Sequence, residues 1–366
     1  QLEEEQDERQ RADKARKAYI AEEMKEKGFV KWRGGWISTE DKALASKDPE
    51  AFILDEETGT WRDKAEVMQE RGFTRVGGKW VRAGTEQDKT DMERFQKLTG
   101  EDIWVITTPH FRIFAQQYPP DQVQEFGELV EKVYAWFLES MNKPADFPLF
   151  RGQPAHLWVL KDKNAFLEWL KHYKNRYSLS DEWVSHVSKG GGNMISGMLG
   201  VTTCDQSRDI KNELVHQTGH FLIWRFSPGL KFPAWLGEAV AHQCEHVHCG
   251  NGTVNCSTMA KYDASGGVAQ KDFSTKDAKD RAKGMIREGS DEPFETLNKI
   301  ELNSLTGDHL AKGWTIIDWL WNDKRDKLVE WLEARNTTET VDAIKKVFDW
   351  SSSKFDKEWA RKVKKG

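Results

Sequence analysis

Apolar and polar residues follow different patterns on the two sides of residue 100. Residues 1–27 carry nine acidic and seven basic side chains with almost no apolar stripe. This composition predicts a charged helical arm held by ion pairs between neighbouring turns. After residue 100, β-rich runs alternate with segments that have apolar residues at helical spacing. The chain is therefore expected to combine a polar N-terminal region with one larger folded domain.

A short repeat separates the arm from the larger domain. At an offset of 44 residues, Met24–Ile37 matches Met68–Val81 in the pattern M-x-E-x-G-F followed by G-x-W. Each copy predicts a helix that ends at glycine, then two short strands around a Gly-rich turn, with one buried Trp in the second strand. We therefore expect two small hairpin modules in residues 28–82 and a linker in residues 83–100.

From residue 101 onward the hydrophobic pattern predicts a sheet followed by helices. The β-rich runs are 103–108 (with 111–114 as its continuation), 157–160 and 194–203, and helical spacing marks 121–137 and 165–173 between them. Beyond residue 206, apolar residues keep helical spacing nearly to the C-terminus. The expected fold class is α+β, with a small mixed sheet in residues 101–205 and a helical part in residues 206–366, together forming one domain over 101–366.

Charge and composition narrow the classes of function. Lys and Arg total 55 against 60 Asp and Glu, and the one basic segment, 354–365, is typical of a solvated helix end. Binding of nucleic acid is therefore not expected. No apolar run approaches the ~20 residues of a membrane helix. The 17 tryptophans are spread along the chain, which indicates core packing rather than carbohydrate stacking.

Three of the four cysteines fall close together, in a segment that also contains histidines. The cysteines are Cys204, Cys244, Cys249 and Cys256. One interpretation is a second metal site that uses His246 and His248. The favoured one is a pair of disulfides in an exported protein, with all three connectivities open. Because the chain starts at Gln1 rather than Met, we expect a removed signal peptide and a secreted or extracytoplasmic (including periplasmic) location.

The segment most informative about chemistry is Glu213–Trp224, ELVHQTGHFLIW. Its apolar positions predict a buried helix, on which His216 and His220 lie one turn apart on one face, as a zinc-binding pair requires. Pro233–Ala241 predicts a second helix that supplies Glu238 as a third ligand. Two His and one Glu would leave the fourth position of a catalytic zinc to water. The alternative is two core histidines bonded to backbone, with the glutamate as a surface charge.

This HxxxH helix, followed by WLGEAVA at 235–241, resembles the gluzincin branch of zinc metallopeptidases. In that family an HExxH helix gives two zinc ligands and a later WLxE-type helix gives the third. The likeness covers roughly residues 101–360. It implies a thermolysin-like fold, a zinc ion (Zn2+), and an extended peptide or protein as substrate or ligand, laid along an edge strand that corresponds to 197–203.

One departure from the family pattern bears directly on mechanism. Gln217 stands where the family has the glutamate that acts as general base. An amide cannot accept a proton from zinc-bound water, so hydrolysis is expected to be impaired or absent. The resemblance also implies an oxyanion-stabilising Tyr or His, for which His309 and Tyr262 are the candidates. A buttressing Asp of thermolysin-like proteins is replaced by His242.

Two functions follow from these observations. The first is a zinc-binding metallopeptidase-like protein with weakened or absent hydrolysis. The alternative is a non-catalytic pseudopeptidase whose cleft, zinc included, binds a peptide or protein partner. Glu245 and His246 follow on the helix of the third ligand. They could extend its polar network, but the favoured interpretation is that they are ordinary exposed helix residues.

Overall fold

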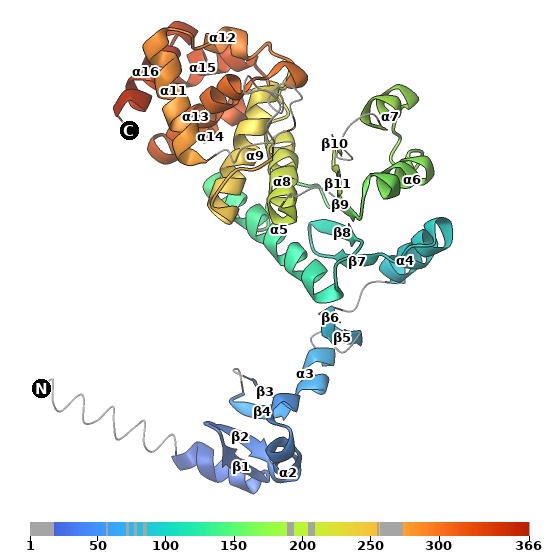
Figure 1. Cartoon of the computed structure of the whole chain (residues 1–366). Helices are drawn as coiled ribbons and strands as arrows, with labels where there is room; N and C mark the ends of the chain where they lie inside the picture. The colour runs from blue at the N-terminus through green and yellow to red at the C-terminus, as the bar shows by residue number, and fades with distance from the viewer. Residues whose placement is uncertain are drawn as a thin grey trace, which may run out of the picture. The chain divides into compact units, whose positions relative to one another are not determined.

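A computed structural model of the chain describes residues 18–55, 58–70, 73–76, 79–82, 86–188, 194–203, 209–254, 256 and 274–365 (Figure 1). The protein is a mixed α+β structure. It divides into two compact units, Gln1–Ala83 and Gly84–Gly366. Within the described ranges, no helix is both long enough and apolar enough to span a membrane.

The first unit is built from short helices and hairpins. After a helical stretch at 18–26, its elements are β1 (Phe29–Trp32), β2 (Gly35–Ser38), α2 (Thr39–Lys47), the 3-10 helix η1 (Pro49–Ala51), β3 (Phe52–Asp55), β4 (Thr60–Asp63), α3 (Lys64–Glu70), β5 (Phe73–Val76) and β6 (Lys79–Arg82). Both repeat copies form antiparallel hairpins, β1–β2 and β5–β6. The first hairpin also joins β3 and β4 in a sheet of order β1-β2-β4-β3, with Ile37 and Phe52 in its core.

The second unit begins with a sheet and the helices that cover it. These elements are α4 (Glu86–Thr99), β7 (Trp104–Thr107), β8 (Phe111–Ala115), α5 (Pro120–Ser140), β9 (Ala155–Leu160), α6 (Lys163–Tyr173), α7 (Asp181–Ser188), β10 (Met194–Ser196) and β11 (Leu199–Thr203). The strand order is β10-β11-β9-β8-β7, with parallel pairs in the centre and an antiparallel pair at each edge.

Two strand predictions need correction. The runs at 103–108 and 111–114 are not one strand but the antiparallel pair β7–β8. The run at 194–203 is also a hairpin, which turns at Gly197 with a φ of 59°, a conformation that glycine adopts readily. As a result β10, rather than β11, forms the edge of the sheet.

The linker expected at residues 83–100 is instead a packed helix from Glu86 onward. Helix α4 places Asp88 and Asp91 in the interior, where Arg112 of β8 binds both carboxylates at 2.7 Å. A polar composition predicts a solvated segment, but here the acidic residues are buried because a buried cation pairs with them. The sequence of α4 alone contains no sign of that partner.

The remaining helices follow the sheet, in the order that the sequence predicts. They are α8 (Ile210–Phe226), α9 (Ala234–Cys249), α11 (Thr275–Glu288), α12 (Phe294–Leu297), the 3-10 helix η2 (Leu302–Ser304), α13 (Gly307–Asp323), α14 (Arg325–Ala334), α15 (Thr340–Phe348) and α16 (Ser352–Lys365). Fully buried tryptophans confirm the prediction of core packing: Trp158, Trp169, Trp235, Trp314, Trp331 and Trp359.

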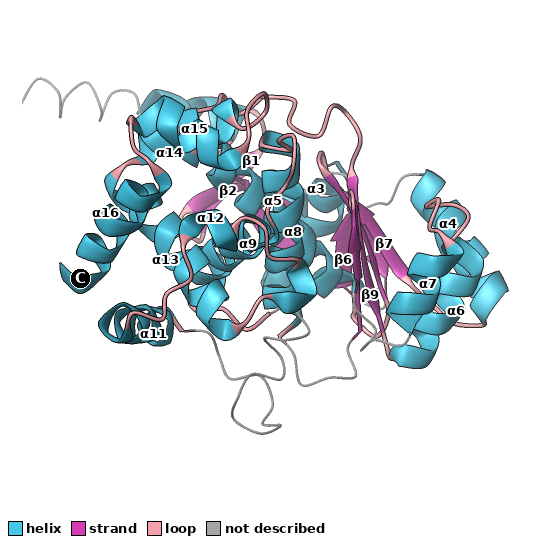
Figure 2. Cartoon of the chain, turned by 90° about the horizontal axis from the view of Figure 1, so that it is seen from above, coloured by secondary structure: helices cyan, strands magenta, loops and turns pink. Residues whose placement is uncertain are grey.

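The sheet separates two hydrophobic cores. Figure 2 shows α4, α6 and α7 on one side of it and α5 and α8 on the other. Because side chains alternate between the faces of a strand, β9 serves both cores. Leu157 and Val159 enter the larger core with α5, α8 and α9, whereas Trp158 and Leu160 enter the smaller one. The larger core therefore lies on the face of the sheet that α8 packs against.

Candidate metal centre

Helix α8 carries both histidines of the HxxxH motif and is buried on nearly all sides. It starts at the N-cap Asp209, whose side chain accepts a hydrogen bond from the backbone of Lys211. Its residues are mostly buried around the whole circumference, which is typical of a helix inside a core rather than on a surface. His216 and His220 are 0% and 3% exposed. Imidazoles so deeply buried need polar partners.

Helix α9 runs beside α8 and brings the third residue of the motif (Figure 1). The two helices approach closely at Gly219, which lies between the histidines. A Cβ at this position would lie 2.7 Å from the Cα of Ala241, so only glycine permits the contact. The close crossing places Glu238, which is fully buried, directly against the histidine pair.

The ligand atoms converge on one point. The Nε2 atoms of His216 and His220 are 3.1 Å apart, and Glu238 Oε1 lies 3.1 Å from Nε2 of His220. The Sγ of Cys256 lies 3.5 and 3.6 Å from the two Nε2 atoms. Ligand atoms arranged tetrahedrally around zinc are about 3.3–3.6 Å apart, as follows from bond lengths of ~2.0–2.3 Å. The two distances from the sulfur fall within this range, and the two of 3.1 Å are slightly shorter. These four residues could therefore hold a metal ion.

A second carboxylate, Glu245, holds the first histidine in place. Its Oε1 lies 2.7 Å from His216 Nδ1, and its Oε2 accepts hydrogen bonds from the Asn212 side chain at 2.9 Å and the Thr253 backbone at 2.7 Å. When His216 donates its Nδ1 proton to this carboxylate, its Nε2 lone pair faces the ligand group. The same carboxylate lies 3.3 Å from Nδ1 of His242.

The expectation that Glu245 is an exposed helix residue is therefore wrong, since it is fully buried. The sequence does contain a signal for it. Glu245 follows Glu238 by seven residues, which is two helical turns, and so lies on the same face of α9. Burial alone would raise the pKa of this carboxyl, but the charges and hydrogen bonds of His216 and His242 lower it to about 2.

Charge coupling among the proposed ligands is strong in the absence of a metal. Burial lowers the pKa of His216, but the charges of Cys256 and Glu245 outweigh it and raise that pKa well above the usual value. Burial raises the pKa of Glu238, and hydrogen bonding and charge from His220 reverse this and lower it. A cation at this point would take the place of the histidine protons, so metal binding would release protons.

Gln217, which the resemblance predicts at the position of a general base, is held between α8 and the sheet. Its Nε2 lies 3.4 Å from the Val201 carbonyl oxygen of β11, and its buried Oε1 has no hydrogen-bond partner among the described residues. A Cβ at Gly200 would lie 2.1 Å from that oxygen, so the glycine makes room for the amide. The amide oxygen can accept a hydrogen bond from water but cannot take up its proton.

Of the two oxyanion candidates, His309 is not part of the ligand group. His309 is the third residue of α13, and its Nδ1 accepts a hydrogen bond of 3.0 Å from the backbone of Thr306 in a capping box. The ring therefore has a structural role at the start of that helix. Tyr262 lies outside the described residues, as does Cys204.

The predicted disulfides do not form among the described cysteines. Cys244, Cys249 and Cys256 are free thiols, and the third of them lies in the ligand group. A second metal site that uses His246 and His248 is not found within the described residues either. His246 packs against the ring of Trp314 and His248 against that of Trp136, and burial lowers the pKa of both histidines to about 4. His246 is therefore half-buried rather than exposed.

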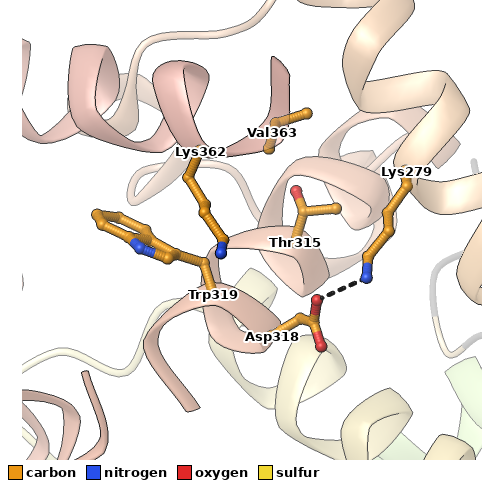
Figure 3. Close-up of a pocket in the computed structure, with 6 residues that line it drawn as sticks. All are labelled: Lys279, Thr315, Asp318, Trp319, Lys362 and Val363. Carbon is orange, nitrogen blue, oxygen red and sulfur yellow. Dashed lines mark ion pairs between the residues drawn. The ribbon is translucent and has the colours of Figure 1, made fainter. Parts of the chain in front are cut away.

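A small cavity of about 50 Å³ lies elsewhere, between α11, α13 and α16 (Figure 3). Lys279 and Asp318 form an ion pair of 3.1 Å at its wall, and Thr315 and Trp319 complete its lining on α13. It has room for little more than ordered water. None of its lining residues belongs to the ligand group.

A comparison with models of known protein families and a search of curated proteins find no match to this chain. The arrangement of His216, His220, Glu238 and Cys256 is therefore the observation on which a functional assignment depends.

Proposed function

We propose that this chain is a zinc-binding, gluzincin-like metallopeptidase in which the replacement of the general base leaves peptide hydrolysis impaired. His216, His220 and Glu238 would hold the metal. The observation that carries the proposal is the convergence of these three side chains, all nearly or fully buried, on one point between α8 and α9. Imidazole, carboxylate and thiol donors at separations close to tetrahedral values suit zinc better than magnesium or calcium.

The order of elements supports the same assignment. A mixed sheet precedes an HxxxH helix, and a WLxE-type helix follows it. Zinc held by His216, His220 and Glu238 alone, with its fourth position open, would polarise a peptide carbonyl. Gln217 would then orient a water molecule through its amide without accepting a proton from it. Loss of a general base typically costs 10²–10⁴-fold in rate. The wild-type chain is therefore expected to cleave peptides weakly or not detectably.

A non-catalytic scaffold is the second candidate function. The amide at position 217 and the capping role of His309 both favour it, because neither supplies acid–base or oxyanion chemistry. Such a protein would bind an extended peptide or protein by pairing it with the outer edge of β10.

Zinc titration of the chelator-treated chain tests the assignment of the ligands. Isothermal titration calorimetry is expected to give one zinc per chain. His220→Ala should weaken zinc binding by more than the ~10–100-fold that follows loss of a hydrogen-bond partner of a ligand, because it removes a metal–nitrogen bond. The matched control is His248→Ala, which alters a histidine outside the ligand group.

Circular dichroism of both variants checks that they fold, and Glu238→Gln provides a second ligand variant. Wild-type affinity and stoichiometry in His220→Ala and Glu238→Gln would show that the metal binds elsewhere, and no zinc uptake by the wild-type chain would contradict the metal site itself.

A further inference from the structure

We propose that Cys256 is a fourth protein ligand, so that a thiolate closes the position that a catalytic zinc leaves to water. The inference rests on the proposed function, because it requires a metal held by His216, His220 and Glu238. It adds that protein ligands fill all four coordination positions of that metal. A site with four protein ligands has no place for a substrate carbonyl or a water molecule.

The position of the sulfur supports coordination. Sγ lies 3.5 Å from His216 Nε2 and 3.6 Å from His220 Nε2. Tetrahedral zinc with bonds of ~2.3 Å to sulfur and ~2.0–2.1 Å to nitrogen separates those atoms by about 3.5–3.6 Å. The sulfur therefore lies at the distance from both histidine nitrogens that a fourth ligand requires.

The backbone of the same residue is tied to the ligand group. The amide of Cys256 donates a hydrogen bond of 3.1 Å to Oε2 of Glu238. This bond occupies one carboxylate oxygen and leaves Oε1, which lies 3.1 Å from His220 Nε2, for the metal. Cys256 thus both completes the ligand group and orients another member of it.

The chain that leads to Cys256 is itself anchored beside the site. The backbone amides of Thr253 and Val254 donate to Glu245 Oε2 at 2.7 and 3.3 Å. The carbonyl of Asn251 accepts a hydrogen bond of 2.8 Å from the side chain of Asn212 on α8. Hydrogen bonds to Glu245 and Glu238 therefore hold the segment that follows α9 against that helix. They place the thiol of Cys256 next to the two histidines.

The other described cysteines serve as a comparison. Cys244 is fully buried in the larger core, and Cys249 is half-buried at the end of α9. Burial raises the pKa of both thiols, that of Cys249 to about 12. Neither belongs to a metal-binding group among the described residues. Cys256 differs from them in its contacts with two histidines, so Cys249→Ala is a matched control for its removal.

Cobalt(II) substitution of the full chain tests the inference without an activity assay. The wild-type protein loaded with Co2+ should show visible d–d bands of four-coordinate cobalt and a near-ultraviolet charge-transfer band from thiolate to cobalt. Cys256→Ala should lose the charge-transfer band and keep d–d bands, whereas Cys249→Ala should keep both. Loss of the d–d bands in His220→Ala assigns the cobalt to this site.

Two outcomes distinguish the inference from the proposed function. If d–d bands depend on His220 but no charge-transfer band depends on Cys256, the thiol is not a ligand and the proposed function stands. If no d–d bands depend on His220, both are wrong. Acetohydroxamate provides a second measurement: it should alter the d–d spectrum of Cys256→Ala but not of the wild type at the same concentration. Equal changes in the d–d spectra of the two proteins would contradict the proposal that Cys256 occupies the fourth coordination position.

Discussion

The double variant Gln217→Glu/Cys256→Ala is expected to cleave an unfolded, fluorescein-labelled protein at least about 100-fold faster than the wild-type chain, with full inhibition by a zinc chelator. The glutamate supplies a carboxylate that can accept a proton from metal-bound water, where the buried amide cannot. Removal of the thiol leaves the fourth position free for that water. Initial rates at equal zinc loading measure the effect.

The single variants separate the two contributions. Gln217→Glu alone should gain little because the thiolate still occupies the fourth position, and Cys256→Ala alone should gain little because no base is present. Gln217→Glu/Cys249→Ala is the matched control for loss of a cysteine. A double variant that binds zinc and still fails to cleave would contradict the peptidase proposal and favour the scaffold.

Glu245→Gln should weaken zinc binding about 10–100-fold and lower the free energy of unfolding by about 3–5 kcal/mol. The carboxylate accepts hydrogen bonds from groups that include the His216 ring, the Asn212 side chain, and the backbone amides of Thr253 and Val254. A glutamine in the same space turns an N–H donor toward other donors and removes the charge that orients His216. Chelator competition measures the affinity, and urea unfolding of the metal-free protein measures the stability.

The control for this variant is Glu125→Gln on α5, which removes an exposed carboxylate 3.8 Å from Lys211. Exposed ion pairs contribute about 0–1 kcal/mol, so little change is expected. If Glu245→Gln binds zinc as tightly as the wild type, Glu245 does not position His216.

The local sequence pattern predicted the features of the site that lie within a single helix. Histidines four residues apart must share a helix face, and the structure has His216 and His220 on one face of α8. The proline-started helix that carries Glu238 is likewise visible in the sequence. What places that carboxylate against the histidines is the close crossing at Gly219, a contact between helices that no periodicity encodes.

The parts that sequence reasoning missed depend on partners distant in the chain. Asp88 looks solvated until Arg112 is placed beside it, and Glu245 looks exposed until α8 covers its face of α9. Cys256 suggested a disulfide because cysteine spacing indicates a cluster but not its partner, which is 40 residues away at His216. In each case the partners of the side chain are tertiary contacts that the local sequence does not show.

X-ray absorption at the zinc K-edge of the zinc-loaded protein tests the central claim most directly. The account predicts a four-coordinate ion with two imidazole nitrogens at ~2.0–2.1 Å, one carboxylate oxygen, and one sulfur at ~2.3 Å. A spectrum without the sulfur would leave the three ligands of the metallopeptidase-like site in place and remove Cys256 from it. A six-coordinate shell of oxygen atoms with no imidazole scattering would contradict the metal centre itself.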